Sequence, residues 1–277
     1  MQTFMRFPGG RCKAVTLSYD DGVEQDARLM QIMDRHGIKG TFNLNSELFA
    51  PEGTVYPAGQ IHRRLTRQQA LALYGGSGHE VAVHGATHPF LEQLPAASAV
   101  SEILRDRQQL EALFGGTVRG MAYPFGTYSD DVVEALRLCG IVYARTAGQT
   151  GSFALPADWL RMTGTCHHNH PDLAGLTERF LAARTDRGPS LFYLWGHSYE
   201  FEADDNWRVI EDFCARIGGR EDVWYATNIE IYDYVTAYSR LQYNAAGTLV
   251  HNPSAIPVWV QCGGLREIPA GADVTLA

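Results

Sequence analysis

Short apolar runs alternate with segments of helical period along most of this 277-residue chain, and brief connections separate them. This alternation is typical of parallel strands joined by helical crossovers. It predicts strands at about residues 13–18, 40–44, 80–83, 118–122, 141–144, 191–195 and 223–226. Because about seven strand–helix units follow one another without a clear sign of sheet reversal, we favour an α/β fold with a closed or nearly closed barrel over an open doubly wound sheet.

The intervening segments predict helices at about residues 24–36, 67–74, 97–114, 130–138, 173–183, 206–217 and 229–240. Thr66 and Gln69 have the spacing of a capping box. Glycines stand where three helices are expected to end, namely Gly37, Gly115 and Gly140. The connections at 47–65 and 146–165 are longer than usual, so they are candidates for substrate contact or simple surface loops.

After Leu241 the sequence changes to Asn, Gly and Pro turns between short β-rich runs at 258–260 and 274–276. We therefore divide the chain into a catalytic barrel at residues 1–240 and a small C-terminal β extension at 241–277. The extension is expected to be a lid or an addition to a sheet.

The formal net charge of −8 and the lack of a Lys/Arg run disfavour nucleic acids and anionic membranes as partners. No apolar stretch has the length of a membrane span or the pattern of a signal peptide. The 5 cysteines are widely spaced and odd in number, which is typical of free thiols in a reducing compartment. We expect a cytoplasmic protein that binds neutral sugars, and its oligomeric state is not indicated.

Chemically active side chains fall just past the ends of predicted strands. Asp20 and Asp21 follow the first strand, His84 the third, Tyr123 the fourth and His197 the sixth. In a parallel barrel these ends converge on one face, where catalytic groups are found. We expect these residues to meet there.

The adjacent carboxylates Asp20 and Asp21 need a cation, because two negative charges leaving a buried strand are poorly solvated and repel each other. A metal ion would neutralise them, although an Asp-Gly turn with a helix cap is about equally compatible with this motif alone. One carboxylate could bind the metal while its neighbour takes a proton from a water molecule activated by the cation. A metal ligand next to a base for water is the arrangement expected of a hydrolase.

His84 and His88 form an H-x-x-x-H pair that ends at Pro89. The spacing points both imidazoles the same way. Two imidazoles and one carboxylate leave coordination positions open, as a catalytic metal requires. The pair alone is a weak signal, but together with the acidic pair it favours a metal site.

His197 ends the most aromatic strand and could protonate a leaving amine or alkoxide, with Glu200 or Asp158 orienting it and raising its pKa. The alternative is a buried structural histidine. A denser cluster, formed by His167, His168 and His170, is interpreted as a solvated or helix-entry group, and a second metal site is the less favoured interpretation.

Four segments together resemble the motifs of the polysaccharide deacetylases of the NodB-homology type, the family 4 carbohydrate esterases. Tyr19–Gly22 is similar to their first motif, His84–Pro89 to the second, Ala122–Gly126 to the third and Leu194–His197 to the fifth. The order and separation of these segments agree with the family over most of the chain.

The resemblance implies a deformed (β/α) barrel of about seven parallel strands that removes acetyl groups from sugars with zinc or a similar divalent ion. It implies that Asp20 is the general base, that His197 is the general acid, and that the Phe125 N–H helps to hold the oxyanion. The implied metal ligands are Asp21, His84 and His88. We expect the substrate to contact Tyr123, Pro124, Trp159, Trp195 and Tyr199, and Asp158, Arg161 and Glu200 to support the site.

The chain departs from the family pattern at three positions. Ala122 replaces an arginine that pairs with the catalytic aspartate, and Arg119 or Arg161 is a hypothetical substitute. Phe125 replaces a tyrosine, and Gly85 replaces a hydroxyl residue between the histidines. These changes bear on efficiency and substrate choice more than on metal binding.

The sequence thus predicts a metal-dependent hydrolase that removes acetyl groups from N-acetylglucosamine-containing or other acetylated saccharides. One alternative is an amide hydrolase acting on a small acylated amine that is not a sugar. Another is a non-catalytic sugar-binding relative with an aromatic groove. An iron oxygenase with two histidines and one carboxylate would give Asp20 and His197 no role.

Overall fold

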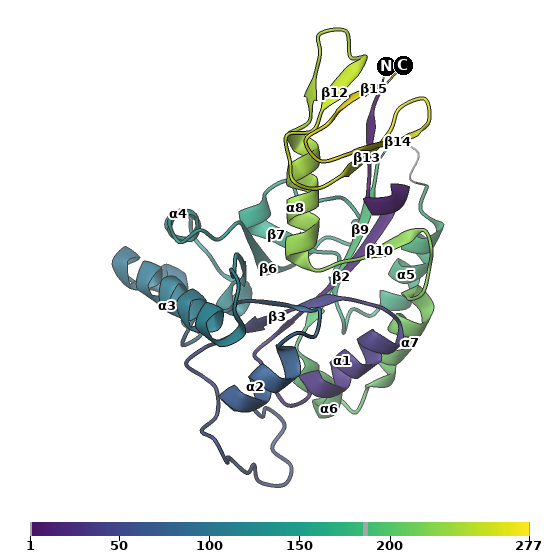
Figure 1. The fold of residues 1–277 in the computed structure, drawn as a ribbon. Coiled ribbons are helices and arrows are strands. Elements are labelled where there is room, and N and C mark those ends of the chain that lie inside the picture. The colour runs from purple at the N-terminus through teal and green to yellow at the C-terminus, as the bar shows by residue number, and fades with distance from the viewer. Residues whose placement is uncertain (1, 185–187, 277) are drawn as a thin grey trace.

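The computed structural model describes residues 2–184 and 188–276, and a parallel sheet occupies its centre (Figure 1). The strand order is β7-β6-β5-β4-β3-β2-β9-β8, and β10 pairs with the first half of β2. The strands are β2 (Lys13–Asp20), β3 (Gly40–Leu44), β4 (Glu80–Val83), β5 (Gly120–Ala122), β6 (Tyr143–Gln149), β7 (Met162–Gly164), β8 (Cys166–His167), β9 (Ser190–Gly196) and β10 (Val223–Tyr225).

The two ends of this sheet, β7 and β8, are consecutive pieces of chain separated only by Thr165. The Thr165 amide donates to Tyr193 O in β9 at 2.8 Å, so the segment lies between β6 and β9 and closes the sheet. The predicted barrel of about seven parallel strands is confirmed. The segment itself falls at the end of a predicted loop, because its short polar sequence carries little strand signal.

The helices cover the outside of the barrel and include every predicted one. They are α1 (Asp26–Arg35), α2 (Arg67–Tyr74), α3 (Ala96–Phe114), α4 (Asp130–Leu138), α5 (Leu173–Ala182), α7 (Arg208–Ile217) and α8 (Asn228–Ser239). The short helix α6 (Ser198–Ala203) was not predicted. Thr66 and Gln69 form the expected capping box at α2. Within the described residues, no helix is both long and apolar enough to cross a membrane.

Burial of the central strand determines where the site lies. All eight residues of β2 are buried, because neighbouring strands flank it and helices cover the sheet. On the outside, α7 packs against both α1 and α5, and α3 packs against α4 (Figure 1). The polar residue that ends β2, Asp20, is therefore held inside the protein, where a charged side chain needs partners.

The C-terminal extension consists of two small antiparallel sheets. One joins β1 (Phe4–Arg6), β13 (Val258–Gln261) and β14 (Leu265–Ile268), and the other joins β11 (Gln242–Tyr243), β12 (Leu249–His251) and β15 (Asp273–Thr275). The N-terminal strand β1 thus lies with the extension, above the barrel in Figure 1. Since β13 and β14 contact the turn Pro8–Gly10 just before β2, the extension lies near the amino end of β2, away from Asp20.

Candidate active site

The carboxyl ends of β2, β4 and β9 bring three distant side chains together. Asp20 Oδ2 lies 3.9 Å from His84 Nε2 and 3.7 Å from His197 Nε2. Asp20 and His84 are almost fully buried, and His197 is partly exposed. One carboxylate oxygen therefore faces both imidazoles at the end of the barrel.

Asp21, His84 and His88 can hold a cation, because one ligand atom from each lies within 4.8 Å of the others. His84 Nδ1 lies 2.8 Å from Ala122 O, and a carbonyl only accepts, so Nδ1 carries the hydrogen. The buried Nε2 has no hydrogen-bond partner among the described residues, and its lone pair is available. A ligating histidine usually has this arrangement, so the residues fit a divalent metal.

The charges in this group also suit a metal. Burial lowers the pKa of His84, and burial next to His84 lowers that of His88 to about 4, so both imidazoles are neutral ligands at neutral pH. Burial opposes ionisation of Asp21, but a hydrogen bond from His62 and the charge of Arg64 hold its pKa below the usual range. One carboxylate and two neutral nitrogens form a ligand set that zinc accepts.

Gly85 has a backbone conformation that other residues rarely adopt, and a side chain there would be tightly packed. Its φ is +76°, and a Cβ there would lie 3.2 Å from Pro124 Cγ and 3.3 Å from Pro89 Cδ. The loop between the histidines is braced instead by Asn45, whose Nδ2 donates to His84 O at 2.6 Å and to Gly85 O at 2.7 Å. Asn45, just past β3, thus holds this loop without a hydroxyl at position 85.

Asp20 is paired with Arg145, which was not among the predicted site residues. An Arg145 Nη2 hydrogen bond reaches Asp20 Oδ2, and Asn43 Nδ2 donates to Asp20 Oδ1 at 2.8 Å. Arg145 is the register partner of Ala122 on the next strand, so it supplies from β6 the guanidinium that is missing from β5. Burial raises the pKa of Asp20, but the charges of Arg145, His84 and His197 hold it below its ordinary value.

The predicted pairing of Asp20 with Arg119 or Arg161 is wrong, because both arginines pair with other carboxylates. Arg119 forms a bidentate pair with Asp233, at 2.6 and 3.1 Å. Arg161 binds Asp158 at 2.6 Å and also Asp130. Both guanidiniums lie near the surface, where they form ion pairs with carboxylates of α4, α8 and the Asp158 turn. Neither guanidinium has to enter the barrel interior.

His197 is oriented by Glu200, one turn along α6. Its Nδ1 lies 3.2 Å from Glu200 Oε1, while Nε2 faces Asp20. Burial lowers the pKa of His197, but the hydrogen bond to Glu200 and the charge of Asp20 outweigh burial and raise it. The other predicted orienting group, Asp158, instead accepts from the Leu160 amide at 2.9 Å.

His167 and His168 are not a solvated pair, contrary to the prediction. Their Nε2 atoms lie 3.2 and 3.0 Å from Glu200 Oε2. His167 Nδ1 accepts from the Asn169 amide at 3.1 Å, so Nε2 carries the hydrogen in the neutral ring. His167, His197 and Glu200 also lie close enough to hold a metal, but in this tautomer the hydrogen on Nε2 of His167 blocks that nitrogen from acting as a ligand.

Residues 8–144 match the family model described as polysaccharide deacetylase. The chain belongs to the polysaccharide deacetylase family. The barrel is similar to a candidate polysaccharide deacetylase from Mycobacterium smegmatis, with a TM-score of 0.59 and 19% identity over 84% of this chain and 93% of that one. It is also similar to the chitin deacetylase of Colletotrichum lindemuthianum, with a TM-score of 0.52 and 17% identity over 82% of this chain and 89% of that one.

A third structure, the Streptococcus pyogenes deacetylase PplD in complex with acetate, has a TM-score of 0.42 and 20% identity over 48% of this chain. This chain spans 55% of the length of that protein. No match was found among curated proteins.

Two of the aromatic residues expected to contact substrate, Tyr123 and Trp195, are buried in this deacetylase-family barrel, whereas Trp159 is partly exposed. Tyr123 and Pro124 are buried, and the Tyr123 hydroxyl donates to Leu160 O at 2.7 Å. Trp195 lies under the Arg145 guanidinium at 4.7 Å, and Trp159 packs on Tyr232 of α8 at 5.2 Å. Tyr123, Pro124 and Trp195 thus contribute to the core, and Trp159 packs against it from a partly exposed position. Their predicted contacts with substrate stay predictions.

Other aromatic side chains surround the candidate metal group. The Tyr199 ring lies 5.3 Å from that of His197. Phe125, whose side chain is 51% exposed, lies 4.5 Å from the His88 ring and stacks on Phe90 at 3.8 Å. Phe90 was not predicted, although it directly follows the second motif. Tyr199 and Phe125 thus contact histidines of the site, and Phe90 packs behind Phe125.

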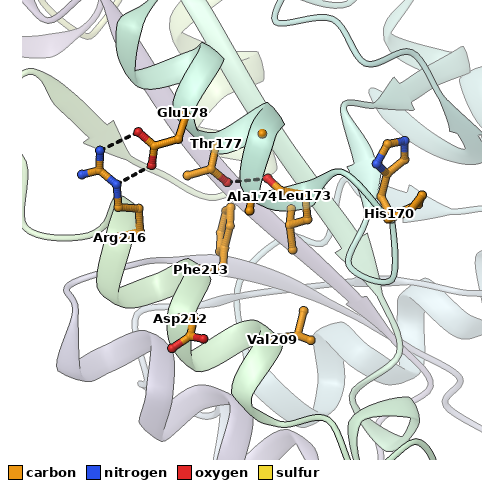
Figure 2. A pocket seen from close by; sticks show the side chains of 11 residues that line it. His170, Leu173, Ala174, Thr177, Glu178, Val209, Asp212, Phe213 and Arg216 are labelled. Carbon is orange, nitrogen blue, oxygen red and sulfur yellow. Dashed lines mark hydrogen bonds and ion pairs between the residues drawn. The ribbon is translucent and has the colours of Figure 1, made fainter.

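A separate cavity lies between α5 and α7 (Figure 2). Its volume is about 670 Å³, and its rim carries the ion pair of Arg216 with Glu178. His170, the third histidine of the predicted cluster, lines it. The cavity lies between the outer helices rather than at the strand ends, so the chemistry of the family does not depend on it.

Proposed function

We propose that this chain is a metal-dependent hydrolase that removes acetyl groups from acetylated carbohydrates. The single observation that carries the proposal is the buried, unpartnered Nε2 of His84, which lies with Asp21 and His88 beside the ion-paired Asp20. Membership of the polysaccharide deacetylase family supports the same reaction and the carbohydrate class of substrate.

In this proposal Asp21, His84 and His88 hold the metal, most suitably zinc, which binds tetrahedrally to nitrogen and oxygen ligands. The bound ion supplies a Lewis acid for the acetyl carbonyl and lowers the pKa of a water molecule. The chain holds the ligands as neutral imidazoles and an ionised carboxylate, so no proton has to leave before the ion binds.

Asp20 and His197 divide the proton transfers. Asp20 is ionised at neutral pH, held by Arg145 and Asn43, and takes the proton of the attacking water. His197, whose pKa is raised, donates its Nε2 proton to the departing sugar nitrogen or oxygen. The Phe125 amide, at a turn where φ is +58°, is proposed to bind the oxyanion.

The substrate is proposed to be short. Because Trp195 is buried beneath Arg145 and the partly exposed Trp159 packs against Tyr232, few aromatic faces are left to form an extended groove for a long polymer. A panel of acetylated chitooligosaccharides, acetylxylan fragments and an acylated polyamine, with zinc added or chelated, tests both the reaction and its substrate. We expect zinc-dependent acetate release from the saccharides, and release from the polyamine alone would favour the small-amine hydrolase instead.

Replacing His84 or His88 with alanine is expected to lower bound zinc from about one ion per chain to near zero, because two ligands do not hold a catalytic ion. Elemental analysis of the purified variants measures this directly. His170→Ala is the matched control, since this histidine lines the outer cavity, and it should keep its zinc. Full zinc content in both site variants would refute the ligand assignment.

Replacing Glu200 with glutamine is expected to move the basic limb of the pH–rate profile to lower pH. The Glu200 carboxylate raises the pKa of His197, so its loss makes the imidazole lose its proton at lower pH. The shift is measured from the profile of kcat/KM between about pH 5 and about pH 10, an interval that covers the titration of an imidazole. Asp158→Asn serves as control, and an equal shift in both variants would contradict the role of Glu200.

A further inference from the structure

The long connection between β3 and α2 folds back onto the end of β2. The Leu65 amide donates to Gly22 O at 3.0 Å, and the Glu24 amide donates to Arg63 O at 2.8 Å. Between these bonds Val23 and Arg64 form an antiparallel bridge. The backbone around Arg64 is therefore fixed beside Asp21, and its side chain starts from an anchored position.

The Arg64 guanidinium contacts Asp21 of the candidate metal site and the neighbouring Asn45. Nη2 donates to Asp21 Oδ1 at 3.0 Å, and Nη1 donates to the backbone carbonyl of Asp21. Nη1 also donates to Asn45 Oδ1 at 2.6 Å. Because Asp21 has φ of +85°, a conformation that side-chain-bearing residues rarely adopt, the bond to its carbonyl helps to stabilise a strained backbone.

Asn45 extends these contacts to the histidines. Its Oδ1 accepts from Arg64, so its Nδ2 must be the atom that faces the carbonyls of His84 and Gly85. The side chain is 1% exposed, and its amide group has partners on both sides. Arg64 and Asn45 thus connect the segment of the carboxylate ligand to that of the histidine ligands.

Asn45 stands just past the end of β3, two residues after Asn43. Asn43 donates to Asp20, whereas Asn45 braces the His84–Gly85 turn. The end of β3 therefore contributes one amide to each half of the site.

We propose that Arg64 and Asn45 are positioning residues that arrange Asp21 and His84 for a cation before the cation binds. This proposal rests on the metal site proposed above. Arg64 has two opposing effects. Its positive charge repels a cation, whereas the two Nη groups of its guanidinium fork fix the carboxylate and the backbone of Asp21. The fork dominates, because the three contacts of Arg64 join segments that are distant in sequence.

Zinc affinity, measured by competition with a chromophoric chelator, tests the proposal without any substrate. Arg64→Ala and Asn45→Ala are each expected to weaken zinc binding by roughly 10- to 100-fold, the usual cost of losing a group that orients a ligand. Arg64→Lys should weaken it similarly, because a single ammonium does not reproduce the fork. Arg119→Ala, which removes a bidentate pair with Asp233 on the surface, is the control and should leave zinc affinity unchanged.

The outcomes separate this proposal from the proposed function. Tighter zinc binding by Arg64→Ala would show that charge repulsion dominates and would overturn the positioning role. Unchanged zinc affinity in Arg64→Lys and Asn45→Ala would also overturn it. Thermal unfolding without zinc identifies a variant that does not fold, and the remaining two variants then decide. A wild-type protein that binds zinc but releases no acetate contradicts the proposed function alone.

Discussion

Asp20→Asn is expected to lower acetate release by about 10²- to 10⁴-fold, the usual contribution of a general base, while zinc content stays unchanged. The amide of asparagine keeps the size of the side chain but does not accept the proton of water at neutral pH. Zinc remains because the proposed ligands are Asp21, His84 and His88. Acetate release and elemental analysis on the same preparation measure both effects.

The control for Asp20→Asn is Asp233→Asn, which also removes a carboxylate paired with an arginine but lies at the surface on α8. It should keep full activity. Loss of zinc in Asp20→Asn would mean that Asp20 is a ligand rather than the base. Full turnover in Asp20→Asn would remove the reason for assigning a proton transfer to this residue.

The sequence predicted the barrel and the meeting of Asp20, His84 and His197 through one rule. Parallel strands point the same way, so residues that follow them meet at one face whatever their separation in the chain. The capping box at Thr66 was predictable for a different reason, because its two hydrogen bonds are local.

The same rule also pointed to Arg145, which directly follows a predicted strand. It was overlooked because the family places its arginine at the position of Ala122. Only the register of β5 against β6 reveals that positions 122 and 145 are neighbours, and register depends on pairing that a single sequence does not display. The guanidinium that is absent at Ala122 of β5 is thus supplied by Arg145 of β6.

The contacts of His62 and Arg64 with Asp21 could not be predicted from the sequence. The connection at 47–65 has no periodic pattern, and its path is set by backbone bonds to the segment after β2. The role of Trp195 was hard to predict for another reason. An aromatic residue at a strand end suits a groove and a core equally, and only its burial in the structure distinguishes the two.

Arg145→Met is expected to destabilise the protein by about 3–5 kcal/mol, because it leaves Asp20 as a buried carboxylate without its counter-charge. Methionine retains an apolar contact with the Trp195 ring, so the loss comes mainly from charge. Burial also raises the pKa of Asp20 once the opposing charge of Arg145 is gone. The acid limb of the activity profile should therefore move to higher pH.

Urea unfolding near neutral pH measures the stability change, and the double variant with Asp20→Asn identifies its cause. If the cost is the unpaired carboxylate, the double variant recovers much of the lost stability without recovering activity. Arg119→Met is the control, since its exposed pair with Asp233 should cost only about 0–1 kcal/mol. Equal costs for Arg145→Met and Arg119→Met would mean that Asp20 does not need the arginine, and Asn43 would then be its principal partner.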